Sequence, residues 1–359
     1  MLFRSGGYPT SANFNNLNYL NNNDLNSYKH SEENPYVEAF WKWWEGELQY
    51  TLRELRVTGG EPTMSQDFWK LMKWWESHPE CSVEFAVNSN LGQKNELFEE
   101  LLKASHNIKS FHLYTSCETV GKQAEYIRDG LNWNKWIKNM DRMLGEGNVQ
   151  STNCMMTINA LCLFGITDFM DEMLKLKVKY KTQSPVCSFN ILRFPSFQSI
   201  VTLPKDIRME RADAIEKWIN DNWDDEKNGF IQWEKDSMIR LVTYIREVET
   251  GHAFTSSLES RERDFKSFYM QYDIRRNKNF VDTFPMLKDW WDSIPETNIK
   301  PLQGYVDGDD AKSNRYVNEV IETAKKEGWI LNPQQPNPGS QEYRELDHQD
   351  EMLNYIKNN

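Results

Sequence analysis

The residues with the clearest chemical potential form a turn, Gly59-Gly60-Glu61-Pro62, directly after a strand-like segment at 54–58. Paired glycines let the backbone approach a ligand closely and adopt a positive φ, and proline fixes the exit of the turn. Exposed carbonyl groups and the Glu61 carboxylate are then able to receive an ammonium group. The alternative is a plain strand–helix connection in which the glutamate is merely solvated.

Further polar residues recur in chain order after the later strand-like segments. They are Asn88, Ser89 and Asn90, then Ser116, Cys117 and Glu118 followed by Arg128, then Thr157 and Asn159, and last Arg193. Asparagine and serine are common turn residues, so each position alone is weak evidence for a ligand. Arg128 could simply pair with Glu118 on the surface, where an ion pair contributes little. Their shared order makes them candidates for one site.

The elements that must position these residues alternate between strands and helices. Strand patterns lie at 54–58, 82–87, 109–115, within 153–163 and at 186–194, and helical periodicity fills the intervals. Such alternation requires parallel pairing with right-handed crossovers. We therefore predict an α/β fold, a partial (open) TIM-type barrel of parallel strands and helices. Ligands of such barrels sit at the carboxyl ends of the strands.

Beyond residue 204 the strand signal stops. Helical patterns lie at 205–222, 231–249, 256–274, 284–293 and 310–327, and a linker at 332–340 leads to a short terminal helix. We predict four segments. They are an Asn-rich arm expected to be disordered (1–35), the partial β/α barrel (36–203), a helical C-terminal region (204–296) and an acidic, polar helical tail (297–359).

Charge and hydropathy exclude several classes of partner. The formal net charge of −12 repels phosphate backbones and argues against nucleic acid. No apolar stretch reaches the roughly 18–20 residues that a membrane span requires. The first residues lack the basic-then-apolar order of a signal peptide, and the odd number of cysteines argues against a secreted disulfide framework. We expect a cytoplasmic protein without a membrane partner.

The position of the glycine-rich turn, after a strand and before a helix, gives the chain a family resemblance. From about residue 36 to 200 it resembles the radical S-adenosylmethionine (radical SAM) superfamily. The superfamily's GGEP motif binds the methionyl amine of S-adenosyl-L-methionine (SAM). The resemblance therefore implies that role for Gly59, Gly60, Glu61 and Pro62.

The resemblance extends to the next strand ends. Ser89-Asn90 lies where many members have Thr-Asn-Gly, although Leu91 replaces the glycine. Asn159 lies on the predicted strand whose polar residues often face the nucleoside of SAM. These residues are therefore expected to bind SAM as well.

A further pair of motifs follows the third strand. Ser116 and Glu118 lie where the superfamily often has Ser-x-Asp, and Arg128-Asp129-Gly130 resembles its Arg-x-Gly element. The resemblance implies contact of these residues with the SAM carboxylate and ribose. The segment 272–290 is similar to the C-terminal stretch of the group with a "twitch" domain.

The superfamily also implies a [4Fe–4S] cluster, held by a CxxxCxxC motif just after the first barrel strand, and an electron donor. Residues 1–35 contain no cysteine, and no two of the five cysteines have CxxC spacing. We interpret all five as core sulfur. The six histidines are scattered and predict no zinc site. No metal ligand is predicted.

Two explanations remain for the missing cysteines. The chain is either a fragment that lacks its cluster-binding segment, which we favour because the Asn-rich opening offers no strand, or a protein that has discarded the cluster. In the first case the complete protein cleaves SAM reductively and abstracts hydrogen from an unknown substrate, and this chain is inactive as given. In the second case the barrel is a non-catalytic scaffold that binds SAM, a nucleoside or a protein.

A third interpretation is an unrelated aldolase-like barrel that uses Glu61 and Glu118 as acid–base residues. It requires a Schiff-base lysine or a metal set at the strand ends, and Lys109 begins its strand instead of ending it. A phosphate-binding GxxxxGK[ST] loop is also absent from the sequence.

Overall fold

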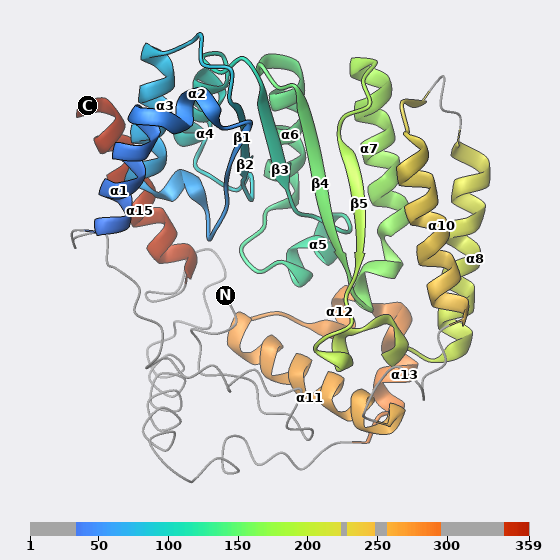
Figure 1. Ribbon diagram of the computed structural model, residues 1–359. Coiled ribbons are helices and arrows are strands. Elements are labelled where there is room, and N and C mark those ends of the chain that lie inside the picture. Colours follow the sequence, from blue (N-terminus) through green and yellow to red (C-terminus); the bar gives the residue numbers. More distant parts are fainter. Residues whose placement is uncertain (1–33, 224–227, 248–256, 296–340, 359) are drawn as a thin grey trace, which may run out of the picture.

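The computed structural model describes residues 34–223, 228–247, 257–295 and 341–358 (Figure 1). The predicted arm at 1–35 lies almost entirely outside the described residues, and so do the helix at 310–327 and the linker at 332–340. The division of the chain into four segments therefore stays a prediction.

The centre of the molecule is an open sheet in which each strand pairs in parallel with the next along the chain, in the order β1-β2-β3-β4-β5. The strands are β1 (Glu54–Val57), β2 (Glu84–Asn88), β3 (Phe111–Thr115), β4 (Ser151–Ile158) and β5 (Val186–Ile191). Among the described residues, β1 pairs only with β2 and β5 only with β4, so the sheet does not close. The predicted α/β fold, an open parallel barrel, is confirmed.

The fourth strand begins just before the segment at 153–163 and covers only the first part of it. Its last residue is Ile158, and a 3₁₀ turn, η6 (Leu161–Phe164), follows. The reason is Asn159, whose side-chain oxygen accepts hydrogen bonds from the backbone N–H groups of Leu161 (2.9 Å) and Cys162 (3.2 Å). A side chain that binds the backbone ahead of it offers an alternative to the ladder and turns the chain.

Helices precede the sheet and alternate with its strands. They are α1 (Pro35–Trp43), a π-helical turn (Trp44–Leu48), α2 (Gln49–Thr51), α3 (Gln66–Ser77), α4 (Asn95–Ser105), α5 (Gly121–Ile127), α6 (Trp133–Glu146) and α7 (Ile166–Tyr180). Trp75 of α3 packs on Phe85 of β2 with ring centroids 4.8 Å apart, and the Trp136 indole of α6 donates to the Thr115 hydroxyl of β3 (3.0 Å). This layer buries one face of the sheet.

The two faces of the sheet differ because successive residues of a strand point to opposite sides. Phe85 and Leu113, on neighbouring strands, belong to the buried, apolar face. On the other face, Arg56 donates to the Tyr114 hydroxyl (3.0 Å), and a ring nitrogen of His112 lies 2.7 Å from the Ser151 hydroxyl. The second face is therefore polar and only partly buried.

The C-terminal helices fall into three groups. They are α8 (Lys205–Asn222) and α10 (Gln232–Glu247), then α11 (Leu258–Arg276), α12 (Phe280–Thr283), the 3₁₀ turn η9 (Pro285–Leu287) and α13 (Lys288–Ser293), and last α15 (Gln341–Asn358). The predicted helix at 205–222 is confirmed, whereas the one at 284–293 begins as a 3₁₀ turn. In Figure 1, α10 and, outside it, α8 lie on the β5 side of the sheet, while α11 and α12 lie near α5, beyond the carboxyl ends of the strands.

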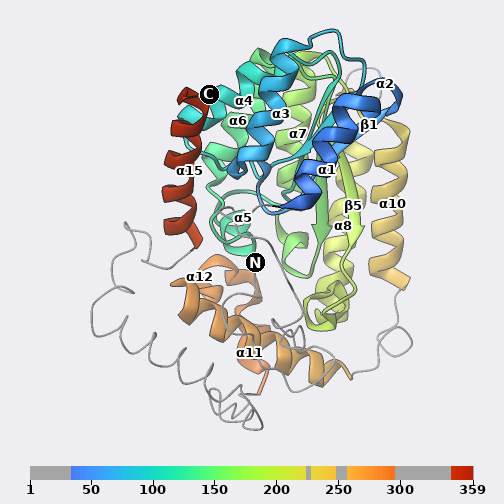
Figure 2. The same cartoon turned by 60° about the vertical axis from the view of Figure 1, so that its left-hand side comes forward.

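The groups are joined to the sheet by polar contacts. Glu234 of α10 accepts a hydrogen bond from the backbone N–H of Cys187 in β5 (2.8 Å) and pairs with Lys177 of α7 (3.1 Å), with both side chains fully buried. Lys94, at the start of α4, pairs with Asp350 of α15 (2.7 Å), so the last helix lies beside α4 (Figure 2). Of the helices within the described ranges, none is both long and apolar enough to cross a membrane.

Candidate functional site

The first strand leads into an open glycine turn. Gly59 has φ of +130°, a conformation that L-residues rarely adopt, and both Gly59 and Gly60 are exposed. A Cβ atom built on either glycine would meet no heavy atom within 4 Å. The backbone of this turn is therefore accessible to a ligand from the carboxyl end of β1.

The Glu61 carboxylate binds protein groups on both of its oxygens. Oε1 accepts from the Thr63 hydroxyl (2.8 Å), the Ser89 hydroxyl (3.0 Å) and the Gln93 amide nitrogen (3.2 Å). Oε2 accepts from the backbone N–H of Asn90 (2.6 Å). The carboxylate thus fastens the glycine turn after β1 to the loop after β2, and the two sequence motifs form one cluster.

The surroundings of Glu61 also affect its protonation. Burial raises the pKa of its carboxyl group, and the hydrogen bonds from Asn90, Thr63 and Ser89 partly oppose that rise. These bonds make the Glu61 side chain a connector between the two loops. Pro62 is buried and opens a 3₁₀ turn, η5 (Pro62–Met64).

The loop after β2 explains how Leu91 can replace a glycine. Leu91 has φ of +54°, in the left-handed region that favours glycine. Its N–H donates to the Ser89 hydroxyl (3.2 Å), and the N–H of Gly92 donates to the Asn90 side-chain oxygen (2.7 Å). These side-chain bonds hold the backbone in the turn that a glycine would otherwise permit.

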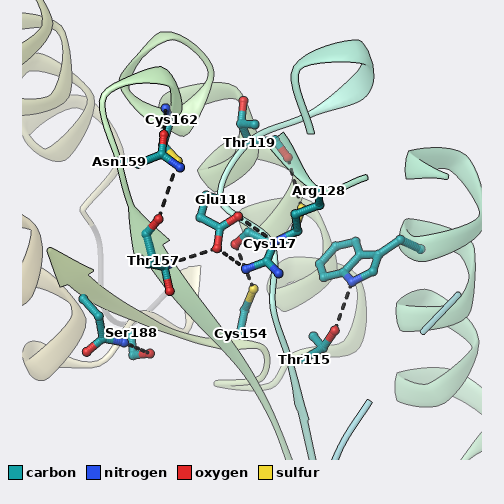
Figure 3. A network of polar contacts seen from close by, with 12 residues as sticks. Thr115, Cys117, Glu118, Thr119, Arg128, Cys154, Thr157, Asn159, Cys162 and Ser188 are labelled. Atoms are coloured by element: carbon teal, nitrogen blue, oxygen red, sulfur yellow. Dashed lines mark hydrogen bonds and ion pairs between the residues drawn. The ribbon is translucent and has the colours of Figure 1, made fainter. Parts of the chain in front are cut away.

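A second cluster lies at the ends of β3 and β4 (Figure 3). Arg128 forms a two-point ion pair with Glu118, with Nε 2.7 Å from Oε2 and Nη2 bound to Oε1. Oε1 also accepts from the backbone N–H of Thr157 (3.0 Å). The predicted pairing is therefore present, but it is not a surface pair, since the Glu118 side chain is only 2% exposed and that of Arg128 31%.

Two further candidates lie beside this cluster. Ser116 is half-buried in the loop that follows β3. Asn159 is half-buried, and the hydrogen bonds that it receives from the following turn engage only its oxygen. The ion pair with Glu118 uses Nε and Nη2 of Arg128. The structure thus brings Ser116, Glu118, Arg128 and Asn159 to the same edge of the sheet as the glycine turn.

The cysteines do not fit an iron–sulfur cluster. Cys117, Cys154, Cys162 and Cys187 are buried, and the Cys154 thiol donates to the backbone oxygen of Cys117 (3.3 Å). Burial raises the pKa of the Cys117 thiol to about 12, so it stays protonated. Within the described ranges, no group of three or more His, Cys, Asp or Glu side chains is placed to hold a metal ion. These residues supply no [4Fe–4S] site.

Two contributors to the site were missed in the sequence. Thr63 and Gln93 both donate to Glu61, and Gln93 is almost fully buried. Thr63 follows the glycine turn directly, so its proximity was available as a signal. The distance of Gln93 from Glu61 along the chain hides its role, although a polar residue four positions after Ser89, to which it also donates (2.5 Å), is a usable hint.

Comparisons with known proteins give one weak structural likeness. No family model and no curated protein matches the chain. A crystal structure of Streptococcus suis SuiB aligns over 64% of this chain and 49% of that chain, with 15% sequence identity and a TM-score of 0.36. The match therefore spans about half the length of SuiB.

Proposed function

We propose that this chain is the SAM-binding barrel of a radical SAM protein. The observation that carries the proposal is the cluster built by Glu61, which joins the GGEP turn to Ser89 and Asn90 and leaves the backbone of Gly59 and Gly60 exposed. A turn that is held by these hydrogen bonds and exposes the backbone of two glycines is suited to binding a ligand.

The role that we assign to each residue follows from the polar atoms that it can offer to a ligand. The carbonyl groups of Gly59 and Gly60 would accept the ammonium group of SAM. Nη1 of Arg128 would meet the carboxylate, with Glu118 holding the guanidinium in place. Ser116 and Asn159 would bind the ribose and the nucleoside. Glu61, Ser89 and Asn90 would position the turn.

The residues of this site do not supply the chemistry of an iron–sulfur cluster. In radical SAM proteins a [4Fe–4S] cluster, reduced by an electron donor, cleaves SAM for hydrogen abstraction from a substrate. The described cysteines do not fit that cluster, and we derive no catalytic step from them. The function proposed for this chain is therefore binding and orientation of SAM.

The second candidate function is a scaffold that binds SAM or a nucleoside without iron. It is favoured by the state of the cysteines, since four of the five are buried core sulfur and Cys81 is half-buried. Anaerobic incubation of the chain with ferrous iron and sulfide, followed by iron analysis and assay of 5′-deoxyadenosine, separates the two. Iron binding with cleavage of SAM would exclude the scaffold.

The test of SAM binding is calorimetric titration of the full chain, without iron, with SAM up to about 1 mM, where a free energy of roughly −4 kcal/mol becomes detectable. A G60L variant is the probe. The space beside Gly60 is open, so the leucine fits the fold but occupies the volume that a ligand would enter. We expect its affinity for SAM to fall about tenfold or more.

The matched control is G46L. Gly46 lies in the π-helical turn, is exposed, and also has no heavy atom within 4 Å of the position that a Cβ atom would take. We expect its SAM affinity to equal that of the unaltered chain. Absence of any SAM binding by the unaltered chain, or an equal loss in both variants, would overturn the proposal.

A further inference from the structure

The segment that carries Arg128 is a short helix with an unusual ending. Helix α5 has only seven residues, and helices of that length are not stable in isolation. Arg128 is its C-cap, and its N–H bonds to the carbonyl of Ala124 (2.9 Å). The last carbonyl groups of a helix have no partner within the helix, so donors from elsewhere in the chain must bind them for the helix to end in a fixed geometry. The direction of Arg128 depends on those partners.

The partners come from α11 and from the connection between α11 and α12. Nζ of Lys278 donates to the carbonyl of Glu125 (2.7 Å) and lies 3.5 Å from that of Tyr126. The Tyr272 hydroxyl donates to the same Tyr126 carbonyl (2.7 Å). A cation at the carboxyl end of a helix also interacts favourably with the helix dipole. Residues about 150 positions away along the chain thus complete α5.

Further contacts hold the residues next to Arg128. Asp129, the residue after Arg128, pairs with Lys278 (2.9 Å) and with Arg276 (3.0 Å). The buried Tyr126 hydroxyl donates to the Asp273 carboxylate (2.7 Å), whose other oxygen accepts from the N–H of Phe280 (2.7 Å). The residues on both sides of Arg128 are therefore held by α11 and the start of α12.

We infer that Lys278 is a positioning residue, which together with Tyr272 completes the end of α5 and so directs Arg128 toward Glu118 and the candidate SAM site. That Arg128 meets a ligand rests on the proposed function, whereas the coupling of α11 to α5 does not. Docking of the C-terminal helices and occupation of the site are then linked, and each favours the other.

The experiment uses a K278M variant of the full chain with two readouts. Hydrogen–deuterium exchange is followed in peptides covering α5 and Arg128, without any ligand, and SAM affinity is measured by calorimetry. Methionine keeps the apolar stem but removes the cation and its donors. We expect exchange in 121–128 to accelerate at least tenfold and SAM affinity to fall by about the same factor, with β2 to β4 unchanged.

The matched control is K288M, the same substitution at an exposed lysine of α13 that pairs with Asp292. It should leave both readouts unchanged. A K278R variant keeps the charge and donors and should restore most of the protection. If K278M destabilises the whole chain, Y272F removes one donor to the Tyr126 carbonyl and should give a smaller acceleration confined to α5.

The outcomes separate the inference from the proposed function. Accelerated exchange in α5 in a chain that binds no SAM would support the coupling and count against the SAM site. Unchanged exchange in α5 of K278M, whatever its SAM affinity, would overturn the positioning role, and so would equal acceleration in K278M and K288M.

Discussion

Two carboxylates stand at the carboxyl edge of the sheet, Glu118 buried and Glu61 half-buried, and their charges are balanced in different ways. Glu118, at the β3–β4 side, faces the guanidinium of Arg128 and a single backbone N–H. Glu61, at the β1–β2 side, is surrounded by hydroxyl, amide and backbone donors and has no cationic hydrogen-bond donor among the described residues. One carboxylate is neutralised by a charge, and the other is solvated by dipoles.

The difference teaches how each loop can respond to change. A carboxylate that depends on one cation loses most of its stabilisation when that cation is removed. A carboxylate with several neutral donors loses only the contribution of one hydrogen bond when one donor is removed, because the remaining donors still satisfy it. The β1–β2 side should therefore tolerate single substitutions that the β3–β4 side does not.

The largest effect is expected at a third carboxylate, which extends the comparison. Glu234 and Lys177 are fully buried as a pair, and Glu234 has two backbone donors besides. Lys177→Met leaves this charge uncompensated and should lower the free energy of unfolding by about 4 kcal/mol. Urea denaturation measures it. Replacing both residues, as K177M/E234L, should recover part of the loss, and a double variant no more stable than K177M would contradict the account.

A somewhat smaller effect is expected at the β3–β4 side. Arg128→Met should lower the free energy of unfolding by about 3 kcal/mol, because Glu118 is left buried while water reaches part of the vacated space. The same urea titration checks it. Arg128→Lys keeps a charge but not the two-point geometry and should be intermediate. A loss below about 1 kcal/mol in Arg128→Met would remove the distinction between the two carboxylates.

The β1–β2 side should lose less. Ser89→Ala removes one of the donors to Glu61 and should lower the free energy of unfolding by about 1 kcal/mol. Thr63→Val should have a similar effect. Thermal or urea unfolding of both variants tests this, and a loss as large as that of Arg128→Met would show that Glu61 depends on one donor instead of sharing its charge.

The weakest signal is the pH dependence of Glu61. Burial raises its pKa in the folded chain, so the folded state binds a proton at higher pH than the unfolded state does. This contribution to stability is complete below the unfolded pKa of about 4.3 and is lost as the pH rises through the folded pKa. Relative to Glu61→Gln, the unaltered chain should therefore gain stability as the pH falls from neutral toward the unfolded pKa of about 4.3. Parallel curves for the two proteins would contradict the assignment.

The sheet was predictable because its signal is local. Each strand segment is short and places its apolar residues on one face, and Phe85, Leu113 and Cys154 lie on the same buried face that the helices cover. Parallel order then followed from the alternation with helices. The pairing of Glu118 with Arg128 was considered in the sequence only as a surface alternative, and its burial was not foreseen, because burial depends on the loops that fold over the pair.

The contacts of the C-terminal helices could not be read from the sequence. Lys278 and Tyr272 donate to backbone carbonyl groups of α5. Every residue has such a group, so the amino-acid types do not show which carbonyls are bound. Helix α11 also mixes charged and aromatic residues around its circumference, so its periodicity does not reveal which side is buried. The saturation of Glu61 was hidden for a similar reason, since one donor is the backbone N–H of Asn90.

The free side of β1 has a consequence for the protein in concentrated solution. In the described part of the chain this strand has a neighbour on one side only, so its outer row of N–H and C=O groups is a template on which another extended chain can add without breaking any existing bond. The strand is only four residues long and carries Glu54 and Arg56. Short length and charge discourage such growth, and replacing both charges with valine would favour the seeding of intermolecular sheets.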